Sequence, residues 1–236
     1  MSENDVIYSG KTKDIYALAN GHLKLVFKDD VTGENGVVDP GANSVMGQIQ
    51  GKGRMSLEMT QYFFEKFHAA HIPTHLVSVD VAQGAMEVKR ADPPGKAISE
   101  TGGLEFICRP LAYGSFLRRY GKYVKAPLQP LDYLVEVTLK DDERGDPLIN
   151  DDALVILGLL TRAQLEQGKE MTRQIATIVE RDLRDKGLTL VDMKIEVGLI
   201  GGEVVLIDEV SADAMRVMDA NGKQLDHQAL YSLLIG

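Results

Sequence analysis

The chain has 236 residues, of which 44% are hydrophobic and 26% charged, with a formal net charge of −9 and an isoelectric point near 5.1. This length is enough for a sizeable core. The sequence has no basic stripe of the kind found in nucleic-acid-binding proteins. It also has no run of roughly 18 apolar residues, the length that a membrane span needs. Because the lone Cys108 cannot form an internal disulfide and the polar start precedes no signal-peptide pattern, we expect a cytoplasmic protein.

Short strands are predicted at the start of the chain, because Asn20-Gly21 favours a tight hairpin between strand-like segments. Between the first two strands lies the segment Gly10-Lys11-Thr12-Lys13. A glycine lets the backbone approach a ligand, and two lysines could meet a polyphosphate. The alternative is a pair of surface lysines beside a turn, since the Walker spacing is absent. The predicted strands are residues 6–8, 15–18 and 22–27.

The next stretch is expected to hold a loop, a helix and a hairpin. Residues 29–53 are glycine-rich and polar, so we expect a long loop or lid there. A helix follows, because Met55, Met59, Phe63 and Phe67 repeat every four residues. A hairpin turning at Gly84 comes next. The Pro- and Gly-rich residues 91–103 are the best candidate for a hinge between two lobes.

The second half begins with an apolar strand at residues 104–109 and the basic pair Arg118-Arg119, which favours an exposed helix face. The acidic residues 140–152 are typical of a solvated loop. A long helix over about 162–186 is predicted, because Thr161 and Gln164 match a capping box.

Alternating residues near the C-terminus carry the strongest chemical pattern. Asp192, Lys194 and Glu196 share one face of a predicted strand, and the residues between them are apolar. Gly201-Gly202 suits a hairpin turn that returns to Asp208. Two carboxylates and a lysine could hold a divalent cation and phosphate oxygens. The alternative is a solvated strand face with a cross-strand ion pair.

These motifs, taken together and in order, resemble those of the SAICAR synthetase family of purine biosynthesis. The resemblance covers essentially the whole chain. The matching stretches are GKTKDIY (10–16), GKGRMSLEM (51–59), FICRPLAYGS (106–115), LKDDERGDPLIND (139–151), LVDMKIEVG (190–198) and IDEVSADAMRVMD (207–219).

The resemblance implies a two-lobed α+β fold related to kinase and ATP-grasp architectures, with antiparallel sheets and packed helices. A β-rich N-terminal lobe, residues 1–90, would cover ATP, and residues 91–236 would hold the metal and acceptor sites. It also implies the reaction, in which ATP, carboxyaminoimidazole ribotide (CAIR) and L-aspartate give SAICAR, ADP and phosphate through an acyl phosphate. A homodimer with small-molecule substrates is implied, without nucleic-acid or membrane partners.

Specific residues of this sequence take roles by the same resemblance. Glu196 and Asp208 would bind Mg²⁺, and Val88 and Lys89 would lie near the adenine. The set implied for ATP and its metal is Gly10, Lys11, Lys13, Val88, Lys89, Glu196 and Asp208.

The acceptor and the chemistry are assigned in the same way. Arg109, Ser115 and Arg216 would hold the ribotide phosphate and neighbouring groups, and Ser211 belongs to a substrate-binding turn. The implied catalytic residues are Asp146, near the acceptor; Lys194, on phosphate or acceptor carboxylate; and Asp192, which we infer orients Lys194 from their shared strand face.

One departure from the family leaves the acceptor open. Many relatives have Arg-x-Arg where this chain has Arg109-Pro110-Leu111, so one cation is missing. Arg118 or Arg119 could replace it. This departure motivates one alternative to the family reaction, an ATP-dependent carboxylate–amine ligase with a different phosphorylated acceptor. A second alternative is a nucleotide-binding or interaction module that has lost catalysis.

Overall fold

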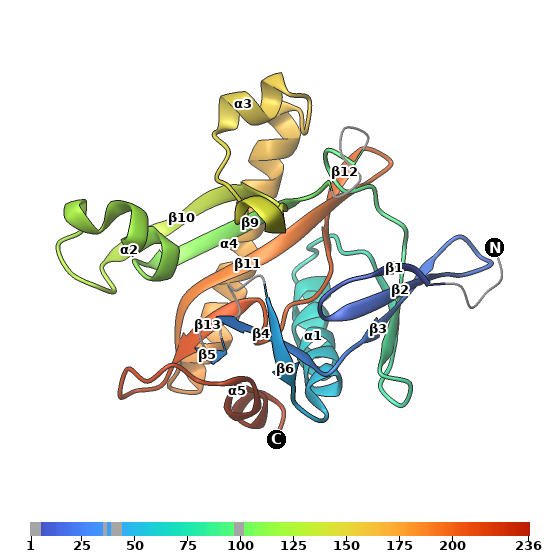
Figure 1. Ribbon diagram of the computed structural model, residues 1–236, viewed down its shortest axis with the longest axis horizontal. Helices are drawn as coiled ribbons and strands as arrows, with labels where there is room; N and C mark the ends of the chain where they lie inside the picture. Colours follow the sequence, from blue (N-terminus) through green and yellow to red (C-terminus); the bar gives the residue numbers. More distant parts are fainter. Residues whose placement is uncertain (1–5, 35–36, 39–43, 97–101) are drawn as a thin grey trace. The chain divides into compact units, whose positions relative to one another are not determined.

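The structure is a computed structural model that describes residues 6–34, 37–38, 44–96 and 102–236 (Figure 1). The chain forms two compact units. Unit 1 comprises Met1–Pro93, Gly198–Ala214 and Asp226–Gly236, and unit 2 comprises Pro94–Val197 and Met215–Leu225. The chain therefore returns to unit 1 twice after leaving it. The functional lobes expected on either side of residue 90 stay a prediction.

A five-stranded antiparallel sheet in the order β1-β2-β3-β8-β7 forms the main part of unit 1. The predicted early strands and the hairpin at Gly84 are confirmed. Gly21 and Gly84 have φ of 84° and 62°, a conformation that glycine adopts without strain. The bounds are β1 (Val6–Ser9), β2 (Lys13–Ala17), β3 (Leu23–Phe27), β7 (Leu76–Asp80) and β8 (Ala85–Val88).

The expected loop at residues 29–53 is wrong where the structure describes three short strands within it. β4 (Asp30–Glu34) pairs with β5 (Val37–Val38) and with β6 (Val45–Gln48), while residues 35–36 and 39–43 lie outside the described part. The glycines and polar residues suggested a loop, but the valines between them favour strands. The Asp29 carboxylate then accepts hydrogen bonds from the N–H groups of Gly51 and Gly53, which fixes the start of the next helix.

The helix α1 (Lys52–Ala69) covers the five-stranded sheet of unit 1. Its predicted apolar stripe is confirmed, since Met59, Phe63 and Phe67 are all fully buried. Leu57 from the same helix packs in one cluster with Leu25, Phe27, Met86 and Val88 of the sheet. Burial of such side chains stabilises the fold by roughly 1.5–3 kcal/mol each.

The C-terminal helix α5 (His227–Leu234) packs on α1. It begins after Asp226, whose carboxylate accepts a 2.8 Å hydrogen bond from the Ala229 N–H and so caps the first turn. The Tyr231 hydroxyl donates a hydrogen bond to the Glu58 carboxylate of α1. The last residues of the chain thus complete unit 1.

Unit 2 is built on an antiparallel sheet in which β9 (Leu104–Leu111) lies between β10 (Pro130–Leu139) and β11 (Thr189–Ile200), and β13 (Met215–Met218) pairs with β11. The helix α4 (Arg162–Asp185) lies against β9 and β10 (Figure 1). Both halves of its predicted capping box form at Thr161 and Gln164. Gly168 allows this approach, because a Cβ there would lie 2.9 Å from the Phe106 ring.

The predicted β-hairpin near the C-terminus is confirmed. β11 turns at Gly201-Gly202, where both residues have positive φ, and returns as β12 (Glu203–Ile207). Its apolar face is buried, as expected, but Asp192 on the other face is also only 3% exposed. The remaining short elements are α2 (Gly114–Tyr120), η1 (Gly121–Tyr123), η2 (Asp142–Arg144) and α3 (Asp151–Ile156).

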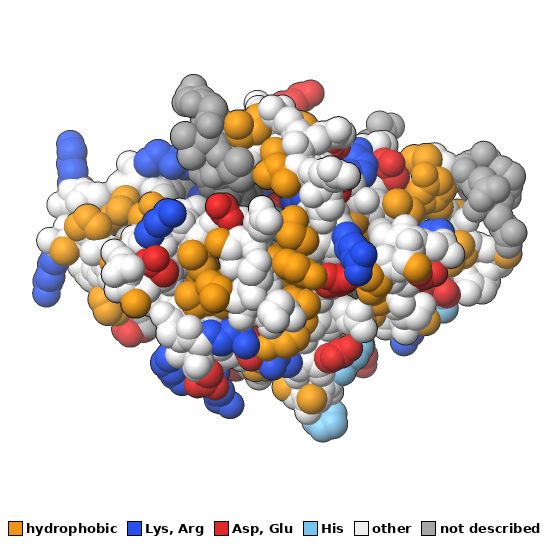
Figure 2. Space-filling view, turned by 90° about the horizontal axis from the view of Figure 1, so that it is seen from below, with side chains coloured by type: hydrophobic (Ala, Val, Ile, Leu, Met, Phe, Trp, Pro, Cys, Tyr) orange, Lys and Arg blue, Asp and Glu red, His pale blue; other side chains and the backbone are white. Residues whose placement is uncertain are grey.

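The predicted α+β class is confirmed by these antiparallel sheets and packed helices. In the part of the chain that the structure describes, no helix combines the length and apolarity needed to cross a membrane. Acidic and basic side chains lie interspersed among hydrophobic ones on the face shown in Figure 2.

Candidate active site

A buried lysine lies at the centre of a polar cluster in unit 1. The Lys13 ammonium, on β2, lies 3.1 Å from Asp208 Oδ1 and forms a second ion pair with Glu209. Burial by itself would lower the pKa of Lys13, but the two carboxylates outweigh this effect and raise it above its usual value. Lys13 is therefore a fixed cation, which is what binding of a phosphate group requires.

Two predicted site residues have an unusual backbone. Asp208 follows β12 with a φ of 66°, and Asp146 has a φ of 49°. Non-glycine residues rarely occupy this left-handed region, and those that do often lie at functional sites. In unit 2, Asp146 Oδ1 accepts a 2.8 Å hydrogen bond from the Asp141 N–H, so its carboxylate closes the loop around η2.

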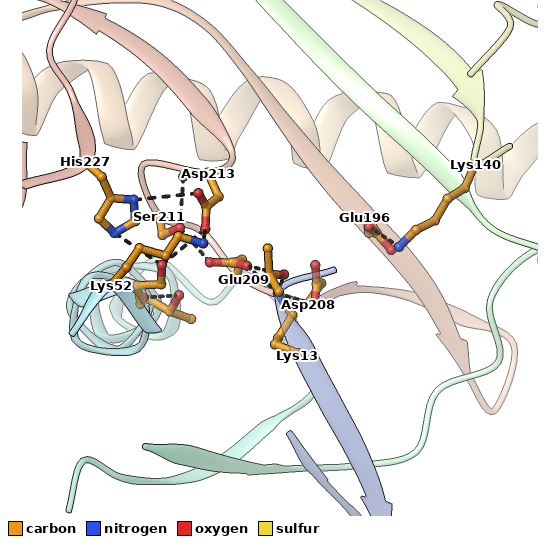
Figure 3. Close-up of polar contacts among 12 residues, drawn as sticks. Lys13, Lys52, Lys140, Glu196, Asp208, Glu209, Ser211, Asp213 and His227 are labelled. Atoms are coloured by element: carbon orange, nitrogen blue, oxygen red, sulfur yellow. Dashed lines mark hydrogen bonds and ion pairs between the residues drawn. The ribbon is translucent and has the colours of Figure 1, made fainter. Parts of the chain in front are cut away.

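The polar cluster of unit 1 continues from Glu209 into the loop after β12 (Figure 3). The Ser211 hydroxyl donates a 2.6 Å hydrogen bond to Glu209 Oε2 and accepts one of 3.1 Å from the Asp213 N–H. Ser211 is fully buried. A direct contact of this hydroxyl with substrate stays a prediction, and the structure gives it a supporting contact to Glu209.

Asp213 joins this loop to the helices α1 and α5. Its carboxylate forms an ion pair with Lys52 at the start of α1, and Ser56 Oγ lies 3.2 Å from Asp213 Oδ2. His227 Nδ1 of α5 lies 3.6 Å from Asp213 Oδ1. Burial alone would raise the pKa of Asp213, but the neighbouring His227 imidazole and the charge of Lys52 hold it well below its usual range.

The other residues predicted for nucleotide also belong to unit 1. Gly10 turns the chain between β1 and β2, with its N–H donating a 2.8 Å hydrogen bond to the Lys13 carbonyl. Lys11 is half-buried beside it. Val88 is a core residue, whereas Lys89 is exposed and its N–H donates to the His75 carbonyl.

An arginine cluster in unit 2 brings together side chains that are far apart in the sequence. Arg109 is 1% exposed and donates to Glu136 at 2.7 Å, to Asp192 at 3.1 Å and to the Ser115 hydroxyl at 2.9 Å. Arg216 Nη1 lies 3.1 and 2.9 Å from the two Asp192 oxygens. The three residues predicted for the ribotide phosphate, Arg109, Ser115 and Arg216, therefore lie in one cluster.

Lys194 has a carboxylate partner, Glu105, that lies far from it in the sequence. Its ammonium lies 2.6 Å from Glu105 Oε1, and the other oxygen of this buried carboxylate accepts a 2.9 Å hydrogen bond from Thr138. Burial would lower the pKa of Lys194, but the charge of Glu105 raises it overall. Glu196, on the same strand face, lies 2.5 Å from the Lys140 ammonium.

The predicted metal ligands are distributed over both units. Glu196 belongs to unit 2 and Asp208 to unit 1, and the hairpin of β11 and β12 connects them along the chain. Each carboxylate forms an ion pair with a lysine, Lys140 or Lys13. Within the described ranges, no group of three or more His, Cys, Asp or Glu side chains is placed to hold a metal ion.

Several residues that support the site are not predicted from the sequence. Glu209 stands between Asp208 and an apolar valine in the motif IDEVSADAMRVMD, and a second acidic residue directly after a predicted metal ligand is a usable signal. Lys52 lies between two glycines of another motif. The remaining three are distant partners that only the sheet register brings into place, namely Glu105, Glu136 and Lys140.

Buried lysine–carboxylate and arginine–carboxylate clusters on an α+β scaffold are typical of an enzyme that acts on anionic, phosphorylated substrates. The profile of the SAICAR synthetase family matches residues 6–234. The phosphoribosylaminoimidazole-succinocarboxamide synthase of Clostridium tetani is 47% identical over 233 residues, which cover 98% of this chain and 99% of the relative. The chain belongs to the SAICAR synthetase family.

Solved structures agree with this assignment. The phosphoribosylaminoimidazole-succinocarboxamide synthase of Ehrlichia chaffeensis superposes with a TM-score of 0.81 at 28% identity, covering 98% of this chain and 92% of that one. A SAICAR synthetase in complex with ADP gives a TM-score of 0.80 at 28% identity, covering 96% and 89%. The predicted family and its fold are thus confirmed.

Proposed function

We propose that this protein is an ATP-dependent ligase that forms SAICAR from CAIR and L-aspartate in purine biosynthesis, with release of ADP and phosphate. The observation that carries the proposal is the match to a synthase of this name over nearly the full length of both chains. The ADP complex of a structural neighbour supports the use of ATP.

The chemistry explains why the site is rich in fixed cations. A carboxylate is a poor electrophile, because its charge is delocalised and hydroxide leaves badly. Transfer of the γ-phosphoryl group of ATP to the CAIR carboxylate gives an acyl phosphate, from which phosphate leaves when the amine of aspartate attacks. Phosphoryl transfer depends mainly on positioning and charge neutralisation, so charged side chains are expected to contribute most of the stabilisation of the transition state.

In unit 1 we assign the nucleotide to the turn between β1 and β2. Gly10 leaves room for the phosphates to approach the backbone, and Lys11 and Lys13 neutralise them. The support is the buried, fully charged state of Lys13 and its place in the GKTK motif. Val88 and Lys89, where β8 ends, are assigned to the adenine.

Glu196 and Asp208 are assigned to Mg²⁺. Their carboxylate oxygens are the ligands that Mg²⁺ prefers, and one or two protein carboxylates with substrate phosphates usually suffice. Each carboxylate is partly exposed and forms an ion pair with a lysine. Each therefore already stabilises a positive charge at the position where the metal ion would bind. When bound, the ion would neutralise charge on the transferring phosphoryl group.

The acceptor is assigned to the arginine cluster of unit 2. Arg109 is buried and already bonded to two carboxylates, so it supports the cluster, while Arg216 and Ser115 make the phosphate contact. Lys194 binds phosphate or the acceptor carboxylate, and Glu105 rather than Asp192 is the partner seen to hold its ammonium. Asp146 approaches the acceptor, and Ser211 supports the turn that carries Arg216.

Leu111 stands where many relatives have the second arginine of Arg-x-Arg, and this difference is the reason to consider a different acceptor. However, Arg119 donates to both oxygens of Glu136, the carboxylate that also binds Arg109. Arg119 therefore supplies a cation to the same cluster. A ligase for a different phosphorylated carboxylate would be favoured if CAIR failed as a substrate.

We propose further that the enzyme acts in the cytoplasm as a homodimer. A single buried thiol, Cys108, fits a reducing compartment. The dimer rests on the family resemblance, and light scattering coupled to size-exclusion chromatography tests it, because a mass near 25.9 kDa would exclude it.

The decisive experiment is an ADP-release assay with Mg²⁺-ATP, CAIR and L-aspartate, in which each component is omitted in turn. Release that requires all three establishes the ligase. Clear binding of Mg²⁺-ATP without release in the presence of CAIR would favour the ligase with a different acceptor. ATP hydrolysis absent with every acceptor would favour the non-catalytic nucleotide-binding module.

A further inference from the structure

Glu209 holds a central place in the polar cluster of unit 1 without any role in the scheme above. We infer that Glu209 is a positioning residue, which holds the Lys13 ammonium in the orientation that meets the ATP phosphates. The inference rests on the proposed function, because it takes Lys13 as a cation that contacts the nucleotide.

The two carboxylate partners of Lys13 differ in accessibility. The Asp208 side chain is 28% exposed, whereas that of Glu209 is 5% exposed. Asp208 is assigned to Mg²⁺, so its charge would be shared with the ion when nucleotide is bound. Glu209 is buried and has no assigned metal contact, so its ion pair with Lys13 does not compete with the ion. Glu209 is therefore the partner that can hold the lysine in both the free and the bound enzyme.

Glu209 is itself held in one orientation. One carboxylate oxygen accepts from Lys13 and from the Thr12 hydroxyl at 3.4 Å, and the other accepts from the buried Ser211 hydroxyl at 2.6 Å. With both oxygens bonded, the carboxylate cannot rotate without losing a partner. Its position is thus determined by the loop after β12.

That loop is anchored in turn to the helices of unit 1. The Asp213 N–H bonds to Ser211, and the Asp213 carboxylate forms its ion pair with the buried Lys52 of α1 (Figure 3). On the other side, the Lys13 ammonium lies 5.1 Å from the centroid of the Phe27 ring. The ammonium is therefore held between an aromatic ring and a carboxylate fixed to the helical layer.

The test measures Mg²⁺-ATP affinity by titration calorimetry in Glu209→Gln, which keeps the shape of the side chain and removes its charge. We expect about tenfold weaker binding, as for a lost charge-assisted hydrogen bond. The KM for ATP rises in proportion, while the KM values for CAIR and aspartate stay within about twofold. Glu209→Asp, which keeps the charge, restores part of the affinity.

A matched control and a double variant separate positioning from stability. Glu58→Gln removes a largely buried carboxylate of the same unit that binds Arg54 and Tyr231, so it lowers stability without changing affinity for Mg²⁺-ATP. In a Lys13→Met background, Glu209→Gln should weaken binding by no more than about twofold, because Glu209 acts through Lys13. Ser211→Ala removes one donor to Glu209 and should weaken binding about threefold, even if Glu209→Gln fails to fold.

Unchanged affinity in Glu209→Gln, or in Ser211→Ala, would overturn this inference alone. So would a full tenfold loss in the Lys13→Met background, since Glu209 would then act independently of Lys13. If the unaltered protein bound no Mg²⁺-ATP, the proposed function and this inference would fall together.

Discussion

Arg109 and Asp192 form a buried ion pair across the adjacent strands β9 and β11, with Nη1 3.1 Å from Oδ2 and side-chain exposures of 2% and 5%. Asp192 also pairs with Arg216 of β13, so one carboxylate joins three strands of the sheet. A charge buried in this way depends on its partners, because water cannot replace them. The pair therefore links the stability of unit 2 to the geometry of the proposed acceptor site.

Replacement of this carboxylate should destabilise the protein strongly. We expect Asp192→Asn to lower the free energy of unfolding by about 3 kcal/mol, because Arg109 and Arg216 lose a shared counter-charge. Urea unfolding followed by circular dichroism measures the change. The control is Asp152→Asn, whose side chain is 80% exposed in a surface ion pair and should cost less than about 1 kcal/mol. Equal costs for the two variants would show that the buried pair does not stabilise unit 2.

The metal assignment predicts a loss of turnover without loss of fold. Glu196→Gln and Asp208→Asn should each weaken Mg²⁺-ATP binding and nearly abolish kcat, because a neutral amide is a poor ligand for a hard cation. ADP release at increasing Mg²⁺ measures the effect. Glu203→Gln, on the exposed start of β12, serves as the control and should retain normal turnover. A near-normal rate in either Glu196→Gln or Asp208→Asn would remove that residue from the metal site.

Arg216 should act mainly on binding of the ribotide. Arg216→Ala is expected to raise the KM for CAIR about tenfold to a hundredfold, the effect of losing a charged hydrogen bond of about 1.5–3 kcal/mol. Steady-state kinetics with CAIR varied at saturating ATP and aspartate provide the measurement. Arg184→Ala, in the exposed last turn of α4, should leave the KM unchanged. A KM for CAIR that did not move in Arg216→Ala would exclude the phosphate contact.

Cys108 should make the protein less stable at alkaline pH. Burial raises the pKa of this thiol to about 12 in the folded protein, compared with roughly 8.5 in an unfolded chain. Between these values the unfolded chain releases a proton that the folded protein keeps, so the free energy of unfolding falls by up to about 1.4 kcal/mol per pH unit as the pH rises.

Unfolding in urea between pH 8 and 10.5 measures this slope for Cys108, and Cys108→Ala isolates it from the titration of tyrosines and lysines. The substituted protein should lose less stability over that range. The thiol should also react with a disulfide reagent only as fast as the protein opens. Immediate reaction of the folded protein at pH 8 would contradict the buried, protonated state.

Periodicity and local turn chemistry were sufficient to predict most of the elements. The stripe of α1, the capping box at Thr161 and the glycine turns are local features, and all of them form. The strands within residues 29–53 are hard to predict because they are short and separated by glycines, so the strand propensity of their valines becomes decisive only when the strands pair.

The site was only partly predictable for a related reason. Arg109, Asp192 and Arg216 lie in quoted motifs, yet nothing in their spacing shows that they share one ion-pair cluster. Partners such as Glu105 for Lys194 and Glu209 for Lys13 depend on sheet register and on a loop returning to β2. A one-residue change of register would turn each side chain to the opposite face, so only the folded structure identifies these pairs.

The interrupted path of the chain through unit 1 has a consequence during synthesis. Unit 1 contains the first strands and also Asp226–Gly236, which are synthesised much later than those strands. The polar groups of Lys52 and Ser56, near the start of α1, are paired only after Asp213 and His227 have been synthesised. A nascent chain that has made only the N-terminal segment of unit 1 would therefore expose apolar helix surface and depend on chaperones until the later segments of this unit are synthesised.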